Sequence, residues 1–149
     1  MNSSPVQPSH SSGSLQSLPQ FMNANLIQQK RLKANYSQIS MAAKEFTSLK
    51  PQYASALTVP PSTTSAARAQ MYSNLRRLCN RYDSLLELRR EMLQMHLEWL
   101  EEAVDAPALK DSAQVLLAIE MQIEAAKELA AMQKEGRLKK ELQALLRSH

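Results

Sequence analysis

Between residues 21 and 49 the apolar positions recur at spacings of three and four, the period of an α-helix with one buried face. These positions are Leu32, Tyr36, Ile39, Ala43 and Phe46. Pro51 follows the run, and proline lacks a backbone donor and disfavours helix at the residue before it. The pattern therefore predicts an amphipathic helix over 21–49 and a proline-containing linker over 50–63.

Two longer apolar patterns follow, each with the helical period and of nearly equal length. They predict helices over 64–104 and 106–146. Neither glycine nor proline interrupts the first of these two segments. With a turn near 105 of only one or two residues, the helices are expected to fold back as an antiparallel hairpin over 64–147.

Polar and special residues mark the ends of these two helices. The hydroxyl residues at 62–64 can supply the N-cap of the first. Asp105 can cap the second, and Pro107 suits its first turn. Gly136 is a weak point inside it, since glycine costs a helix backbone entropy.

A turn centred near 105 also predicts a register, in which facing residues have numbers that sum to about 209 or 210. Apolar residues then meet at seven-residue intervals, as in a coiled coil: Leu100 with Leu109, Leu93 with Leu116, Leu86 with Ile123, and Cys79 with Ala130. Arg89 and Glu120 have the same sum, and we expect them to form an ion pair that specifies the alignment. The alternative is that Arg89 reaches solvent on its long stem.

The second half of 64–104 carries more apolar residues than a hairpin seam needs. The additional stripe, at spacings of 4, 3 and 4, consists of Leu88, Met92, Met95 and Trp99. The third helix has a poorer counterpart in Leu117, Met121, Ala125 and Met132. Methionine and tryptophan suit adaptable interfaces, so the stripe is predicted to bind a helix outside the hairpin, with Trp99 as its anchor. That helix is a partner's, a second copy's, or the first helix of this chain folding back to complete a three-helix bundle.

The first twenty residues are rich in serine, proline and glutamine and hold little to bury, which predicts a disordered tail over 1–20. The expected fold class is therefore all-α: a long antiparallel, coiled-coil-like hairpin with an additional N-terminal helix and a disordered N-terminal tail.

The net charge of +4 arises from one segment, because residues 30–60 hold five basic residues against one acidic residue. The basic residues are Lys30, Arg31, Lys33, Lys44 and Lys50. They are a candidate contact for nucleic acid or another anionic surface, although such a series often forms a solvated helix face. Residues 83–128 instead carry eleven acidic residues against four basic residues, a balance that favours a partner of opposite charge.

No set of residues predicts catalysis or metal binding, and we expect no enzyme activity, metal or cofactor. Cys79 and His96 lie about 25 Å apart along one helix and cannot form a nucleophile–base pair. A single cysteine and the lack of an apolar run of membrane length favour an intracellular location, with nucleus and cytoplasm undistinguished.

These features predict a non-enzymatic scaffold or adaptor subunit of a multiprotein complex, bound to other helical subunits. Three alternatives remain open: a homodimeric coiled coil, a nucleic-acid or membrane-surface binder that uses 30–50, and a substrate of a bacterial secretion system. The last rests on the uncharged, serine-rich first 29 residues.

Overall fold

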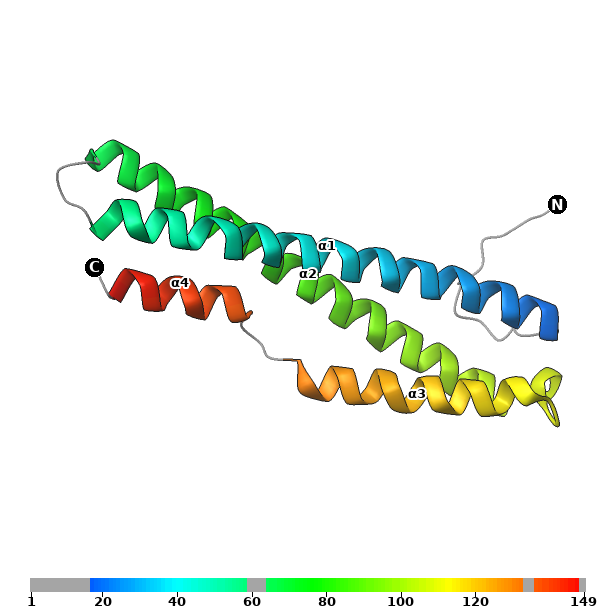
Figure 1. Ribbon diagram of the computed structural model, residues 1–149. Helices are drawn as coiled ribbons and strands as arrows, with labels where there is room; N and C mark the ends of the chain where they lie inside the picture. Colours follow the sequence, from blue (N-terminus) through cyan, green and yellow to red (C-terminus); the bar gives the residue numbers. More distant parts are fainter. Residues whose placement is uncertain (1–16, 59–63, 133–135, 148–149) are drawn as a thin grey trace, which may run out of the picture. The chain divides into compact units, whose positions relative to one another are not determined.

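The computed structural model describes residues 17–58, 64–132 and 136–147, and this part of the chain is helical without a strand (Figure 1). The elements are α1 (Leu18–Thr58), α2 (Ser65–Asp105), the short 3-10 helix η3 (Pro107–Leu109), α3 (Ala113–Ala131) and α4 (Arg137–Arg147). The predicted all-α fold class is confirmed. Most of the predicted tail, residues 1–16, lies outside the described residues, whereas residues 18–20 are helical.

Helix α1 is longer at both ends than the sequence predicts. Ser17 caps its start, because its hydroxyl accepts the backbone N–H of Gln20 over 3.2 Å. The predicted stop at Pro51 is wrong, since α1 continues to Thr58. Next to Pro51, the Gln52 side chain donates to the Ser48 carbonyl over 3.3 Å.

Tertiary contacts explain why the helix continues past Pro51. Tyr53 and Ala54 pack against an apolar cluster, and the Tyr53 hydroxyl accepts a hydrogen bond from Asn74 Nδ2 over 3.1 Å. The predicted linker over 50–63 is therefore helical as far as residue 58, and residues 59–63 lie outside the described part. Helix α2 begins as predicted, since Thr64 Oγ1 accepts the backbone N–H of Ala67 over 3.1 Å.

The chain divides into two compact units. Unit 1 holds the described residues up to Lys33 together with Arg90–Met132, and so contains α3. Unit 2 holds Ala34–Arg89 and the described residues from 136 onward, and so contains α4. Helices α1 and α2 contribute one segment to each unit, and each unit is a set of three packed helices.

In unit 1 two apolar clusters connect the three helices. One is formed by Phe21, Trp99, Leu100, Ala103, Leu109 and Ala118, and the other by Leu32, Leu93 and Ala125. Along α1 the numbers rise from the first cluster to the second, whereas along α2 they fall. Helix α2 is therefore antiparallel to α1 and to α3, and the predicted hairpin of α2 with α3 is present.

The register of this hairpin differs from the predicted one. The predicted pair of Leu100 and Leu109 does share a cluster, with Leu109 at the end of η3. Farther from the turn, Leu93 shares a cluster with Ala125, and Leu100 also shares its cluster with Ala118, so facing residues of α2 and α3 have numbers that sum to about 218. The reason is the turn, which spans residues 106–112 and includes η3, so that it is centred near residue 109. The predicted partners of Leu93 and Leu86, which are Leu116 and Ile123, are both exposed.

The predicted cap of the third helix is also wrong. Asp105 is the last residue of α2, and Pro107 begins η3. The cap of α3 is Ser112, whose hydroxyl accepts the backbone N–H of Gln114 over 3.0 Å. Before it, Asp111 has a positive φ of 64°, a left-handed conformation that aspartate tolerates better than most residues.

In unit 2 α4 packs its apolar ridge against α1 and α2. The buried residues of this cluster are Phe46, Leu75, Leu78, Cys79, Leu138, Leu142 and Leu145. Two ion pairs join α4 to the other helices, Lys50–Glu141 at 3.3 Å and Lys139–Asp83 at 3.5 Å. Cys79 thus packs against α4 instead of its predicted partner Ala130, which is exposed.

The predicted third helix is two helices, since α3 ends at Ala131 and α4 begins at Arg137. Gly136, the predicted weak point, directly precedes α4. A Cβ atom at Gly136 would overlap Asp83 Oδ1 and lie 2.9 Å from Tyr82 Cδ1. A side chain at this position would therefore have to displace the side chains of Asp83 and Tyr82.

Candidate protein-interaction surface

Trp99 belongs to the core of unit 1 and does not anchor a foreign helix. Its side chain is 8% exposed, and its ring stacks on Phe21 of α1 with centroids 5.0 Å apart and planes 8° from parallel. Helix α1 therefore covers the stripe at this point, as the three-helix alternative predicted. Phe21, near the start of α1, lies alongside the end of α2.

The other members of the predicted stripe do not share one environment. Met92 is half-buried against the cluster of Leu32 and Leu93. Met95 is 68% exposed in unit 1, and Leu88 is exposed in unit 2. The four residues thus do not form a continuous open surface.

The predicted ion pair of Arg89 and Glu120 depended on a register in which the numbers of facing residues sum to about 209, and the structure has a different register. Arg89 Nη1 donates to Asn35 Oδ1 over 3.3 Å, and the guanidinium lies 5.6 Å from the centroid of the Tyr36 ring. Asn35 in turn donates to the Leu85 carbonyl over 3.2 Å. In the observed register position 120 faces the region of residue 98, and Glu120 is exposed.

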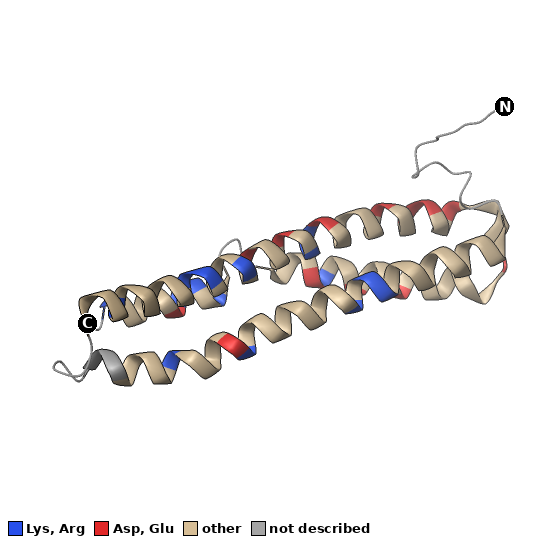
Figure 2. Ribbon diagram, turned by 90° about the horizontal axis from the view of Figure 1, so that it is seen from above, with Lys and Arg blue, Asp and Glu red and all other residues tan. Residues whose placement is uncertain are grey.

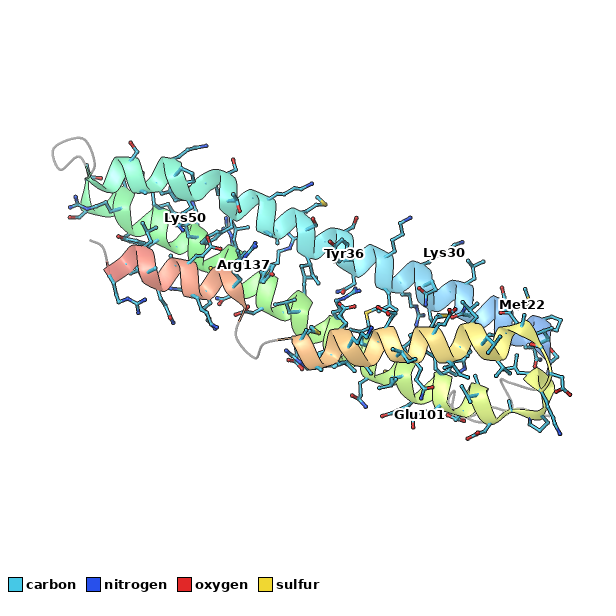
Figure 3. All side chains as sticks on the ribbon, turned by 60° about the horizontal axis from the view of Figure 1, so that its bottom comes forward. Met22, Lys30, Tyr36, Lys50, Glu101 and Arg137 are labelled. Atoms are coloured by element: carbon cyan, nitrogen blue, oxygen red, sulfur yellow. The ribbon has the colours of Figure 1, made fainter. Side chains whose placement is uncertain are left out.

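The five basic residues of α1 are divided between the two units. Lys30, Arg31 and Lys33 belong to unit 1, and Lys44 and Lys50 belong to unit 2. Lys50 is half-buried in its ion pair with Glu141, while Lys30 points outward from α1 (Figure 3). Arg31 and Lys33 lie two residues apart and so point to different sides of the helix.

His96 is a buried connection between α1 and α2. Gln29 Nε2 lies 3.3 Å from its Nε2, and because an amide nitrogen can only donate, His96 Nε2 accepts. His96 Nδ1–H therefore donates to Gln28 Oε1 over 2.6 Å. The ring is neutral in this arrangement, and burial lowers the pKa of His96 from its ordinary value of 6.5.

Cys79 is a packing residue in unit 2. Burial raises the pKa of its thiol to about 11, and the negative charge of Asp83 adds to the effect. A thiol with so high a pKa is almost entirely protonated near neutral pH, so it is a poor nucleophile. Within the described residues no three histidine, cysteine or acidic side chains are grouped to hold a metal ion.

An apolar surface open to solvent does occur, on α3. We name it the α3 stripe: Leu116, Ile119, Ile123, Ala126 and Ala130. Its spacings of 3, 4, 3 and 4 place all five residues on one face. Leu116 is 67% and Ile123 is 50% exposed, and Ile119 between them is half-buried. On the opposite face Ala118 and Ala125 are buried.

A second exposed face, on α2, carries carboxylates at the same spacing. We name it the α2 acidic face: Glu91, Gln94, Glu98, Glu101 and Asp105. Figure 2 shows the acidic positions along this half of α2, and Figure 3 shows Glu101 on its outer side. No basic residue interrupts the series.

The contacts of α1 show where these two faces lie within unit 1. On α2, Trp99 and His96 contact α1, so the opposite flank, with Gln94 and Glu101, is nearer to α3. On α3, Met121 Sδ accepts a hydrogen bond from α1, so the α3 stripe, on the other flank, is nearer to α2. Helical periodicity thus places the α3 stripe and the part of the α2 acidic face with Gln94 and Glu101 on the side of unit 1 away from α1.

Sequence reasoning missed the α3 stripe because it placed most of the same residues in the hairpin seam. Of the poorer counterpart, Met121, Ala125 and Met132 pack inward instead, whereas Leu117 is exposed. Ala118 and Ala125, seven residues apart, are the signal for this close helix contact. A seam of small residues allows two helices to approach closely, at the cost of a weak hydrophobic signal.

No helix among the described residues is both long and apolar enough to cross a membrane. Comparison of the chain with protein-family models, with curated proteins and with solved structures gives no match. The function is therefore argued from the surfaces described above.

Proposed function

We propose that the protein is a non-enzymatic helical subunit of a multiprotein assembly, and that the α3 stripe is the surface through which it binds a partner helix. The observation that carries this proposal is the exposure of Leu116 and Ile123 on one face of α3, with Glu120 and Lys127 beside them. Contiguous exposed apolar surface on a folded chain is typical of an interaction site.

The helical architecture supports the same function. Docking of an amphipathic helix against an apolar face is a common mode of protein recognition, read as contacts at spacings of three and four. The α3 stripe has this spacing over about four helical turns. An intracellular location is part of the proposal, because the single cysteine, Cys79, has a structural place in the core of unit 2.

The experiment is a mass measurement of the chain recovered from its native extract, made on wild type and on two variants. Ile123→Ser removes an exposed apolar side chain from the α3 stripe, and Met41→Ser makes the matched change on α1 of unit 2, where Met41 is 65% exposed. We expect wild type and Met41→Ser in an assembly with other proteins, and Ile123→Ser largely free of them.

The same measurement on the purified chain supplies the reference. A wild-type chain that has the mass of a monomer both alone and in the extract would contradict the proposal. Loss of the assembly in both variants would place the interaction elsewhere than on the α3 stripe.

A further inference from the structure

We propose that the occupant of the α3 stripe is an amphipathic helix of a different protein that carries basic residues along its flanks. The inference rests on the proposed function and adds the chemistry of the partner. Three observations carry it: the shape of the stripe, the charge beside it, and the arrangement that pairing with a second copy would produce.

The α3 stripe suits one helix. From Leu116 to Ala130 it extends about 21 Å along α3, which corresponds to about fifteen residues of a helical partner. Alanine at 126 and 130 allows a close approach of the two backbones at one end. Leucine and isoleucine at 116, 119 and 123 supply most of the apolar area. The contact is therefore that of two helices packed along their length.

The surroundings of the stripe are negative on both flanks. On the side of α2, helical periodicity places Gln94 and Glu101 of the α2 acidic face nearest to the stripe, with the other carboxylates of that face farther out. On the other side α3 carries Glu120, Glu124 and Lys127, and Lys127 is paired with Glu124 at 3.6 Å. A helix that lies on the stripe thus has acidic groups along both edges, and basic flanks complement them.

Self-pairing through the stripe places like charges together. In an antiparallel pair of α3 helices related by a two-fold axis, each flank faces the same flank of the other copy, so the two α2 acidic faces would oppose each other. In a parallel pair, the α2 acidic face would lie beside the flank with Glu120 and Glu124. Both arrangements bring carboxylates together without enough basic residues to neutralise them, which favours a partner of opposite charge.

The test measures the affinity of two synthetic peptides for the full chain by fluorescence anisotropy. Each peptide has about 21 residues, with leucine and alanine alternating at heptad positions, long enough to cover the stripe. One peptide carries lysine at the flanking positions, and the other carries glutamate there. We expect the lysine peptide to bind at least about tenfold more tightly, with an affinity that falls as salt is added.

Charge and apolar variants of the chain test each part of the contact. Glu98→Lys combined with Glu101→Lys should lower the affinity for the lysine peptide at least about tenfold and raise the affinity for the glutamate peptide. Ile123→Ser should lower the affinity for both peptides. Glu45→Lys and Met41→Ser, which alter exposed positions of α1 in unit 2, should change neither affinity.

The outcomes separate the chemistry of the partner from the proposed function. Equal binding of the two peptides, lost in Ile123→Ser, would overturn the basic flanks and leave the docking surface standing. Absence of binding by both peptides, or binding that Ile123→Ser does not change, would overturn both. A wild-type chain that forms dimers, and that becomes monomeric in Ile123→Ser, would identify a second copy as the occupant and overturn this inference.

Discussion

Replacing Trp99 with alanine should destabilise the folded chain strongly, because the ring is enclosed between α1 and α2. Trp99 is the largest side chain of its cluster, whose other buried members include Phe21, Leu100 and Ala103. Without the indole, one face of the Phe21 ring loses its partner and the first turns of α1 lose their main attachment to α2.

The expected loss can be estimated from the burial and the stacking. Truncating a buried tryptophan to alanine typically costs about 3–5 kcal/mol. A stacked aromatic pair contributes about 0.5–1.5 kcal/mol beyond its burial, which places Trp99→Ala toward the upper end of the range. Because a domain is stable by only about 5–15 kcal/mol, this is a large fraction of the total.

The assay is urea unfolding followed by circular dichroism, since the chain has one tryptophan and its fluorescence disappears with the substitution. With a slope of about 2 kcal/mol per molar urea, a loss of about 4 kcal/mol lowers the midpoint by about 2 M. Met95→Ala is the matched control on the same helix. The Met95 side chain is 68% exposed, so the free energy of unfolding of this variant should stay within about 0.5 kcal/mol of that of wild type.

A double-mutant cycle with Phe21→Leu then isolates the stacking. The coupling energy between Trp99 and Phe21 should be about 0.5–1.5 kcal/mol. The reasoning would be refuted if Trp99→Ala and Met95→Ala had equal, small effects, because Trp99 would then be an open surface residue and α1 would not cover it.

Three further predictions concern buried groups. Because burial lowers the pKa of His96 from its ordinary value of 6.5, the unfolded chain binds more protons than the folded chain once the pH falls to that value. Stability should therefore not depend on this histidine well above pH 6.5 and should fall as the pH drops through 6.5, and urea midpoints should show a smaller fall in His96→Gln than in wild type. Gly136→Ala should cost about 1–3 kcal/mol through overlap with Asp83 and Tyr82, and Asp83→Ala in the same chain should restore part of the loss in thermal unfolding. Cys79, with a pKa of about 11 and a buried side chain, should react with a thiol reagent at least about a hundredfold more slowly in the folded chain than in urea, and equal rates would contradict its burial.

Helical periodicity was sufficient to predict the class of fold and the course of α2, because its apolar face and its Thr64 cap are local features of the sequence. It was insufficient at Pro51, a residue type that ordinarily ends a helix. There the packing of Tyr53 and Ala54 against the apolar cluster of unit 2 stabilises the continued helix. Local propensity and tertiary contact compete at such positions, and a single sequence does not show which contacts will form.

The length of one turn accounts for most of what was mispredicted in the candidate surface. A turn of one or two residues would bury Leu116 and Ile123 against α2, whereas the observed turn over residues 106–112 shifts the register of the facing positions. The new register buries Ala118 and Ala125, leaving the α3 stripe open. Apolar residues at heptad spacing occur on two faces of α3, and only the turn decides which of them faces α2.

The central claim is that a partner covers the α3 stripe, and the rate at which a thiol at position 123 is labelled tests it directly. Ile123→Cys places a reactive group on the stripe, while the native Cys79 stays buried and slow to react. In the isolated chain the new thiol should be labelled rapidly, and in the assembly recovered from native extract it should be labelled at least about tenfold more slowly. As a control, a thiol introduced by Met41→Cys should react at the same rate in the isolated chain and in the assembly. Equally fast labelling at position 123 in the isolated chain and in the assembly would contradict the claim.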